Sequence, residues 1–145
     1  VVDVGESGYP GAPEGRFTRV SVFMSPLDVH VNRAPVGGEV LALEHTAGEF
    51  RAAFSDHASQ HNERNLIVLG DAAGRRHAMV QVAGYLARRI VCRLRPRERV
   101  EAGERIGLIM FGSRVDHFVP AEYSIVVRIG DRVRAGESVI GELQQ

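Results

Sequence analysis

Apolar and polar residues alternate with a period of two in several short stretches of the chain, a pattern typical of half-buried β-strands. Residues 17–24 (FTRVSVFM) form one such stretch. Residues 66–69 and 78–83 are predicted to pair as a hairpin, because the turn-rich segment 70–74 lies between them. Further strands are expected at residues 39–44 and 106–111.

Two segments do not fit a strand clearly. Residues 46–64 carry phenylalanine and histidine side chains at helical spacing and are predicted to form a helix or an irregular loop. Residues 85–94 fit either a short helix or a strand. The first sixteen residues, rich in glycine and proline, are expected to form a strand end and a long loop. The chain is therefore predicted to be mainly β, with one or two short helices.

One short motif occurs twice in the C-terminal third. Residues 100–106 (VEAGERI) return as residues 133–139 (VRAGESV), and each copy places a glycine turn between two β-branched residues. The motif resembles the strand corner of biotinyl and lipoyl carrier domains, which implies a barrel-sandwich fold, a hybrid of the lipoyl and biotinyl type. A chance recurrence in a glycine-rich β protein is the alternative.

The composition narrows the possible chemistry. The 145 residues are enough for one domain, and eighteen basic residues balance eighteen acidic ones, so no global field attracts nucleic acid. Every basic residue is arginine, which excludes a lysine Schiff base, a pyridoxal phosphate anchor and a lysine-linked biotin or lipoyl group. The single cysteine, Cys92, is predicted to be a small buried side chain in a reducing compartment.

The chain begins with Val1 rather than methionine, and it is expected to be a piece of a longer protein. It contains no apolar run of eighteen residues and no signal peptide. This portion is therefore expected neither to span a membrane nor to carry an export signal.

Four separated blocks carry a specific resemblance. Residues 99–116 read RVEAGERIGLIMFGSRVD, and residues 25–35 read SPLDVHVNRAP. Residues 62–65 (NERN) and 87–90 (ARRI) lie between them. In this order the blocks resemble the short form of phosphatidylserine decarboxylase proenzymes, and the resemblance extends over residues 19–143.

The resemblance implies self-cleavage between Gly112 and Ser113. In that family the serine hydroxyl attacks the preceding carbonyl, an ester forms, and β-elimination and hydrolysis leave an N-terminal pyruvoyl group. Gly112 has no Cβ, which would keep its carbonyl open to attack. The expected products are a β chain of residues 1–112 and an α chain of residues 113–145. The pyruvoyl cofactor made from Ser113 would accept the electrons released with carbon dioxide.

His30 is the expected proton-transfer residue. Asp28 and His30 would lie on one face of an extended segment, so Asp28 can orient the imidazole, and the resemblance assigns a histidine of this motif to self-cleavage. The alternative is a histidine bound by the backbone of a proline-bounded loop. The aspartate that completes an Asp-His-Ser group in the family is not in this chain, and Asp3 and Asp28 are poor substitutes by position.

Two further groups of side chains have weaker implications. His57 and His61, with Asp56 beside them, would share a helix face, but no third ligand follows at a recognisable spacing, so a solvated face is favoured and no metal site is predicted. His117 follows the expected cleavage site closely and could line the same pocket.

A basic run places six arginines within twelve residues: Arg88, Arg89, Arg93, Arg95, Arg97 and Arg99. An extended run would project every second guanidinium to one side, where phosphate head groups or an anionic membrane surface could bind. Ion pairs with neighbouring glutamates and solubility are the alternative. No aromatic side chain interleaves the run, so nucleic acid is not an expected partner.

The resemblance implies an enzyme that converts phosphatidylserine to phosphatidylethanolamine. We expect it to act peripherally on a phosphatidylserine-containing membrane, at the cytoplasmic face of a bacterial cell, and to form a homo-oligomer. Two alternatives are a pyruvoyl decarboxylase of a soluble amino acid and a non-catalytic, lipoyl-like binding module.

Overall fold

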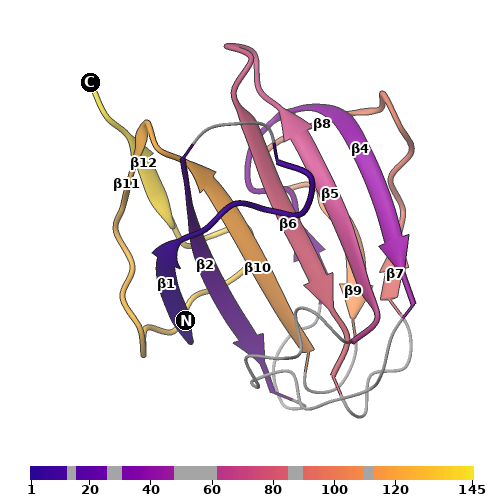
Figure 1. The fold of residues 1–145 in the computed structure, drawn as a ribbon, viewed down its shortest axis with the longest axis horizontal. Helices are drawn as coiled ribbons and strands as arrows, with labels where there is room; N and C mark the ends of the chain where they lie inside the picture. Colours follow the sequence, from indigo (N-terminus) through magenta and orange to yellow (C-terminus); the bar gives the residue numbers. More distant parts are fainter. Residues whose placement is uncertain (13–15, 26–30, 48–61, 85–89, 110–112) are drawn as a thin grey trace.

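The computed structural model describes residues 1–12, 16–25, 31–47, 62–84, 90–109 and 113–145. Within these ranges the secondary structure consists of strands, without a helix (Figure 1). The strands are β1 (Asp3–Glu6), β2 (Phe17–Met24), β3 (Val31–Arg33), β4 (Gly38–Thr46), β5 (Arg64–Gly70), β6 (Arg76–Val82), β7 (Ile90–Cys92), β8 (Arg99–Val100), β9 (Arg105–Ile109), β10 (Ser113–Pro120), β11 (Tyr123–Ile125) and β12 (Gly141–Leu143).

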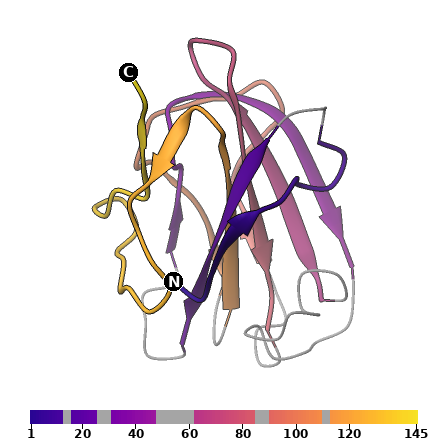
Figure 2. The ribbon, with the colours of Figure 1, turned by 60° about the vertical axis from the view of Figure 1, so that its left-hand side comes forward.

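The described strands form two facing antiparallel sheets and a separate hairpin. The larger sheet has the order β1-β2-β10-β6-β5-β4-β8, and the smaller has the order β3-β9-β7. Strands β11 and β12 pair at the C-terminal side of the molecule (Figure 2). The mainly β, sandwich-like architecture is confirmed. The two sheets are separate layers and do not close into a barrel. The one or two short helices that the sequence predicted do not occur in the described ranges.

The main core lies between the two sheets. Ile67 of β5, Met79 of β6 and Val115 of β10 project from the larger sheet and pack with Ile106 and Ile109 of β9. The two central strands β5 and β6 are buried on both faces, which is why their sequences are nearly continuous apolar runs. The buried centre of the larger sheet lies directly beside β10, which pairs with β6.

A second core covers the outer face of the larger sheet. Tyr9, from the N-terminal segment, packs edge-on against Phe17 and Phe118, with ring centroids 5.1 and 6.1 Å apart. These rings join the outward-facing side chains of β5 and β6, among them Leu66 and Val80. The N-terminal segment thereby shields a face that would otherwise expose apolar side chains.

Most of the expected strands are present. Strand β2 has the predicted bounds, residues 39–44 lie inside β4, and β5 and β6 pair as the predicted hairpin. Strand β9 fits the prediction for residues 106–111 as far as Ile109, beyond which residues 110–112 are not described.

The two segments with unclear patterns have different outcomes. Residues 48–61, most of the expected helix or loop, lie outside the described residues, as do residues 85–89. Within the second ambiguous segment, Ile90–Cys92 form β7, so the strand interpretation holds there. Cys92 is only half-buried, contrary to the prediction of a buried thiol.

The repeated motif forms the same turn twice. Gly103 and Gly136 have φ angles of 82° and 77°, a left-handed conformation that type II turns require at their third residue. Each turn closes with a 3.1 Å backbone hydrogen bond, from Glu104 to Glu101 and from Glu137 to Arg134. The first turn joins β8 to β9, whereas the second is not flanked by strands on both sides.

Arg33 links the two turns. Its Nη1 donates to the Gly103 carbonyl at 2.8 Å. A Cβ added to Gly136 would lie 2.6 Å from Arg33 Cδ. Glycine in the second turn therefore leaves room for the arginine side chain that holds the first.

Candidate active site

Ser113 is the first residue of β10 and is completely buried. It lies opposite Met24 of β2 in the antiparallel register. Its hydroxyl has no hydrogen-bond partner among the described residues. A buried hydroxyl without a partner carries a desolvation cost, and such groups in native structures are often retained for chemistry.

The two faces of β10 have different surroundings. Ser113 and Val115 point toward the smaller sheet, because Val115 belongs to the core between the sheets. Arg114 and Asp116 point to the outer face, where Arg114 Nε lies 2.9 Å from Asp116 Oδ1. Asp116 is therefore buried close to Ser113 in sequence but on the opposite side of the sheet, and it cannot act on the serine hydroxyl.

Three buried amide side chains bridge the two sheets next to Ser113. Asn65 Nδ2 donates to Gln81 Oε1 at 2.9 Å, and Gln81 Nε2 donates to Asn32 Oδ1 at 2.8 Å. Asn32 Nδ2 lies 3.7 Å from the sulfur of Met24, the residue paired with Ser113. We call Asn65, Gln81 and Asn32 the amide chain. It connects β5 and β6 of the larger sheet to β3 of the smaller one.

Gly107 of β9 makes room for the amide chain. A Cβ at this position would lie 2.4 Å from the Val91 carbonyl oxygen and 2.7 Å from Gln81 Nε2. Gly107 also pairs directly with Asn32 between β9 and β3. The glycine thus allows Gln81 to reach across the core to Asn32.

Sequence reasoning did not identify the amide chain. Asn32 and Asn65 lie inside two of the four blocks that carry the family resemblance. Gln81 lies inside an apolar strand and belongs to no motif. The available signal was the amide itself, since a polar side chain on the inner face of a central strand requires buried partners. Register between distant strands decides which partners it meets, and sequence periodicity does not determine that register.

The remaining expected site residues are not described. Asp28, His30 and Gly112 lie in the undescribed segments 26–30 and 110–112, so their roles stay predictions. Asp3 lies on the edge strand β1 and forms an ion pair with Arg19. This pairing agrees with the expectation that Asp3 is a poor substitute for the upstream aspartate.

His117 shares the inward face of β10 with Ser113 but lies four residues further along. At about 3.4 Å per residue, their Cα atoms are roughly 13 Å apart along the strand, and a pocket lined by both residues stays a prediction. Burial lowers the pKa of His117 to about 4, although the neighbouring Asp116 carboxylate acts in the opposite direction. His117 is therefore a neutral side chain at physiological pH.

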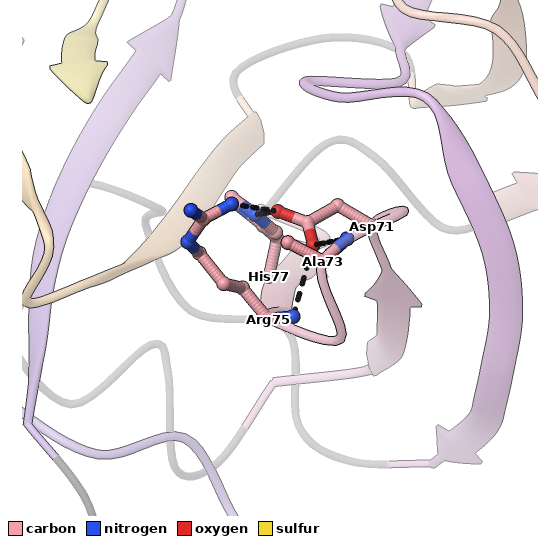
Figure 3. A network of polar contacts seen from close by, with 4 residues as sticks. All are labelled: Asp71, Ala73, Arg75 and His77. Atoms are coloured by element: carbon pink, nitrogen blue, oxygen red, sulfur yellow. Dashed lines mark hydrogen bonds and ion pairs between the residues drawn. The ribbon is translucent and has the colours of Figure 1, made fainter.

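A second polar cluster lies at the other end of the larger sheet, in the turn between β5 and β6 (Figure 3). Asp71 Oδ1 accepts from the backbone N–H groups of Ala73 at 3.0 Å and Arg75 at 2.9 Å. Asp71 Oδ2 lies 3.0 Å from His77 Nε2 and 3.3 Å from Arg75 Nη1. Burial alone would raise the pKa of Asp71, but these hydrogen bonds, led by that of His77, outweigh it and lower the pKa.

The arginine run does not form one extended ridge. Strand β7 ends at Cys92, and the chain then turns at residues 95–98, where Arg97 has a φ of 68°. The Glu98 carboxylate accepts from the Arg95 backbone N–H at 2.9 Å. Arg88 and Arg89 lie outside the described residues. The expected projection of alternate guanidinium groups to one side is therefore wrong beyond Cys92.

A hollow of about 420 Å³ lies near this turn, lined by Arg93, Leu94, Glu98, Glu104 and Arg105. Arg105 begins β9, whereas Ser113 follows the other end of that strand. The hollow is therefore separate from the candidate active site. It has charges of both signs and gives no indication of a ligand.

Two further observations concern the described ranges alone. They contain no cluster of three or more histidine, cysteine or acidic side chains arranged to hold a metal ion. His57, His61 and Asp56 lie in the undescribed segment 48–61. Nor do the described ranges contain a helix long and apolar enough to cross a membrane.

Comparison with known proteins agrees with the resemblance seen in the sequence. The family model for phosphatidylserine decarboxylase matches residues 8–141. A phosphatidylserine decarboxylase proenzyme of Desulfotalea psychrophila is 46% identical over 130 residues, which cover 90% of this chain and 61% of that protein. The corresponding proenzyme of Mycolicibacterium vanbaalenii is 49% identical over 131 residues, or 90% of this chain and 56% of the relative.

A third proenzyme, from a Wolbachia of Brugia malayi, is 44% identical over 144 residues, covering 97% of this chain and 63% of the relative. The chain thus spans about three fifths of the length of these relatives. No solved structure matches it. Since the family model covers most of the chain and the identities exceed 40%, the chain belongs to the phosphatidylserine decarboxylase family.

Proposed function

We propose that the protein containing this chain decarboxylates phosphatidylserine to phosphatidylethanolamine, after cleaving itself between Gly112 and Ser113. The observation that carries the proposal is the state of Ser113, which is completely buried at the start of β10 with a hydroxyl that has no partner among the described residues. The family assignment favours this activity over decarboxylation of a soluble amino acid and over a non-catalytic binding module.

Self-cleavage begins with the Ser113 hydroxyl. Its oxygen attacks the Gly112 carbonyl carbon, the peptide C–N bond breaks, and the Ser113 nitrogen takes up a proton, which leaves an ester. Loss of the Ser113 α-proton then forms a Cα=Cβ bond and expels the Gly112 carboxylate. The resulting dehydroalanine rearranges, and one water molecule hydrolyses it to a pyruvoyl group and ammonia. His30, oriented by Asp28, is the proposed base for these proton transfers.

The surroundings of Ser113 fit a group made from that residue. Its oxygen is completely buried and has no partner among the described residues, and its backbone is held by pairing with β2. A ketone at this position supplies an electron sink for the electrons released with carbon dioxide, a role that no lysine-bound cofactor can take in a chain without lysine. His30 is the proposed donor of the proton that replaces the carboxylate.

Intact mass after treatment with a carbonyl-trapping reagent tests the self-cleavage. The full-length protein should yield a C-terminal fragment of residues 113–145 that carries one reagent molecule, because the new N-terminus is a ketone. A variant Ser113→Ala should remain uncut and unlabelled. An active wild-type protein that stays in one piece, without a reactive carbonyl, would overturn the proposal.

The substrate is tested on lipid. Vesicles that contain phosphatidylserine should release carbon dioxide, whereas free serine and aspartate should not. Turnover of a free amino acid, without turnover of the lipid, would instead favour the soluble decarboxylase. A protein with neither activity, uncut even with its upstream segment present, would favour the binding module.

The remaining parts of the proposal concern the assembly. The cleaved β and α chains stay together, because β10 of the α chain lies between β2 and β6 of the β chain. The protein is proposed to form a homo-oligomer and to act peripherally at the cytoplasmic face of a bacterial membrane. Flotation with phosphatidylserine-containing vesicles and a mass measurement in solution test these two statements.

A further inference from the structure

We propose that Asn32 hydrogen-bonds to the side-chain oxygen of Ser113 as that oxygen leaves during β-elimination, and that Gln81 and Asn65 hold Asn32 in position. The inference rests on the proposed self-cleavage. It assigns a catalytic role to one amide and a positioning role to two others that sequence reasoning passed over.

The direction of the amide chain follows from its last contact. The Met24 thioether can only accept a hydrogen bond, so the Asn32 group that faces it, at 3.7 Å, is the NH₂ group. Asn32 Oδ1 then accepts from Gln81, and Gln81 Oε1 accepts from Asn65. All three amides therefore point the same way, and such aligned groups polarise one another.

The amide chain ends in a donor that has a poor acceptor. A thioether sulfur is a weak acceptor, yet Asn32 is only 4% exposed, so the described surroundings leave its NH₂ group poorly satisfied. Ser113 lies opposite Met24 and is fully buried. Its hydroxyl oxygen also lacks a hydrogen-bond partner among the described residues. Directly opposed residues of antiparallel strands have Cβ atoms about 5 Å apart, which places the Ser113 side chain beside the Met24 side chain that the Asn32 amide contacts.

An N–H donor at the Ser113 side-chain oxygen favours the β-elimination more than the first attack on the Gly112 carbonyl. During the first attack the serine oxygen must be electron-rich, and a donor does not assist it. During β-elimination the α-proton leaves, its electron pair forms the Cα=Cβ bond, and the Cβ–O bond breaks. Negative charge then develops on the departing oxygen, where a preorganised N–H stabilises it. Removal of the Asn32 donor should therefore slow elimination and leave the ester.

The ester can be measured directly, because hydroxylamine cleaves esters and leaves peptide bonds intact. In the full-length protein, Asn32→Leu should form the pyruvoyl chain about 100-fold more slowly and accumulate a chain that hydroxylamine cuts at position 113. Gln81→Met, which keeps the volume but removes the bridge, should accumulate the same ester with a slowdown of about tenfold. Met24→Leu is the matched control and should cleave within about threefold of the wild-type rate.

A pH series separates a chemical role from a structural one. Asn32→Asp places an acceptor at the departing oxygen when ionised, but regains an O–H donor when protonated. Its elimination rate relative to wild type should therefore rise as the pH falls, whereas that of Asn32→Leu should stay constant.

Three results would overturn the assignment. They are wild-type elimination in Asn32→Leu, a folded Asn32→Leu that hydroxylamine does not cut, and a slowdown in Met24→Leu equal to that in Asn32→Leu. If Ser113→Ala blocks cleavage while the Asn32 variants behave as wild type, only the role of Asn32 fails. If Ser113→Ala still yields a pyruvoyl chain, the proposed function fails as well.

Discussion

The two ends of the central strands hold polar clusters of opposite character. At the β5–β6 turn, at the top of Figure 1, four donors surround the two oxygens of Asp71. At the start of β10, at the bottom of Figure 1, the Ser113 hydroxyl has no described partner, and the amide chain ends on a thioether. The first cluster meets the demands of folding, whereas the second leaves buried polar atoms unsatisfied, as expected where chemistry takes precedence over stability.

Ser113→Ala should separate the two demands most sharply. The substitution removes the proposed nucleophile, so chain scission and carbon dioxide release should both be lost. Stability should not fall, and the free energy of unfolding of the uncut protein should rise by about 1 kcal/mol, because the substitution removes a buried hydroxyl that has no partner among the described residues. Gel electrophoresis and denaturant unfolding measure the two effects, with an uncut wild-type precursor as the stability reference.

Ser138→Ala is the matched control for this comparison. Its hydroxyl accepts a 2.8 Å hydrogen bond from the exposed Arg134 backbone N–H, so it has a partner and no proposed chemistry. Scission should be complete in this variant. A clear loss of stability in Ser113→Ala would contradict the view that its hydroxyl lacks a partner.

Gly107→Ala should damage the Ser113 end through packing. The new Cβ would meet Val91 O at 2.4 Å and Gln81 Nε2 at 2.7 Å, so the backbone or the amide chain must move. Overpacking of this kind costs about 2–3 kcal/mol of unfolding free energy, and the displaced Gln81 should slow pyruvoyl formation as well. Thermal unfolding and the time course of scission report the two effects.

Gly5→Ala provides the control, since a Cβ at Gly5 meets nothing within 4 Å. Its stability and scission rate should match the wild type. Equal behaviour of Gly107→Ala and Gly5→Ala would show that Gly107 does not support the amide chain.

Asp71→Ala tests the satisfied end of the sheet. The change leaves the buried His77 ring and two backbone N–H groups of the turn without their acceptor, and should lower the unfolding free energy by about 2 kcal/mol. Scission should be unaffected, because the turn lies at the opposite end of β6 from Ser113. Asp131→Ala, which removes a similar 2.8 Å acceptor from an exposed turn, should have a smaller effect on stability. A slower scission in Asp71→Ala would show that the two ends are coupled.

The strands could be predicted from the sequence, whereas the polar contacts next to Ser113 could not. Strand β2 and the β5–β6 hairpin follow from period-two alternation and turn residues, which are local properties. The role of Ser113 was predicted from a motif of neighbouring residues and stays a prediction, although the structure shows that its side chain is buried. The amide chain joins residues 32, 65 and 81, and their meeting depends on the packing of one sheet on another. Local patterns do not encode that packing.

The arginine run also shows that a sequence pattern does not by itself determine the backbone. Its alternation suggested one extended ridge, but the turn at residues 95–98 ends the extended conformation. Proline at position 96 suits the second position of such a turn, and Arg97 adopts the positive φ that follows it. The spacing of the arginines therefore indicates charge alone, whereas the proline decides where the backbone turns.

The smallest expected effect on stability is that of His117. Its substitution also tests whether residues of the inward face of β10 other than Ser113 take part in scission. Burial lowers its pKa to about 4 in the folded protein, against 6.5 for an unperturbed histidine. As the pH falls below 6.5 the unfolded chain binds a proton that the folded protein refuses, so stability is lost between pH 6.5 and about 4. Part of the His117 side chain is exposed to solvent, which weakens the effect of burial on its charge, so we expect a loss of about 1 kcal/mol between pH 7 and pH 5.

His117→Leu should remove that part of the pH dependence and keep scission at the wild-type rate, because His117 lies roughly 13 Å along β10 from Ser113. Denaturant unfolding gives the free energy of unfolding of both proteins at pH 7 and pH 5. The loss between the two pH values in the wild type, minus the loss in His117→Leu, is the contribution of His117, because the other titrating groups contribute equally to both proteins. If the two proteins lost equal stability on acidification, the pKa of His117 would not be lowered in the folded protein. A scission rate that fell with the substitution would instead extend the reactive region of β10 beyond Ser113.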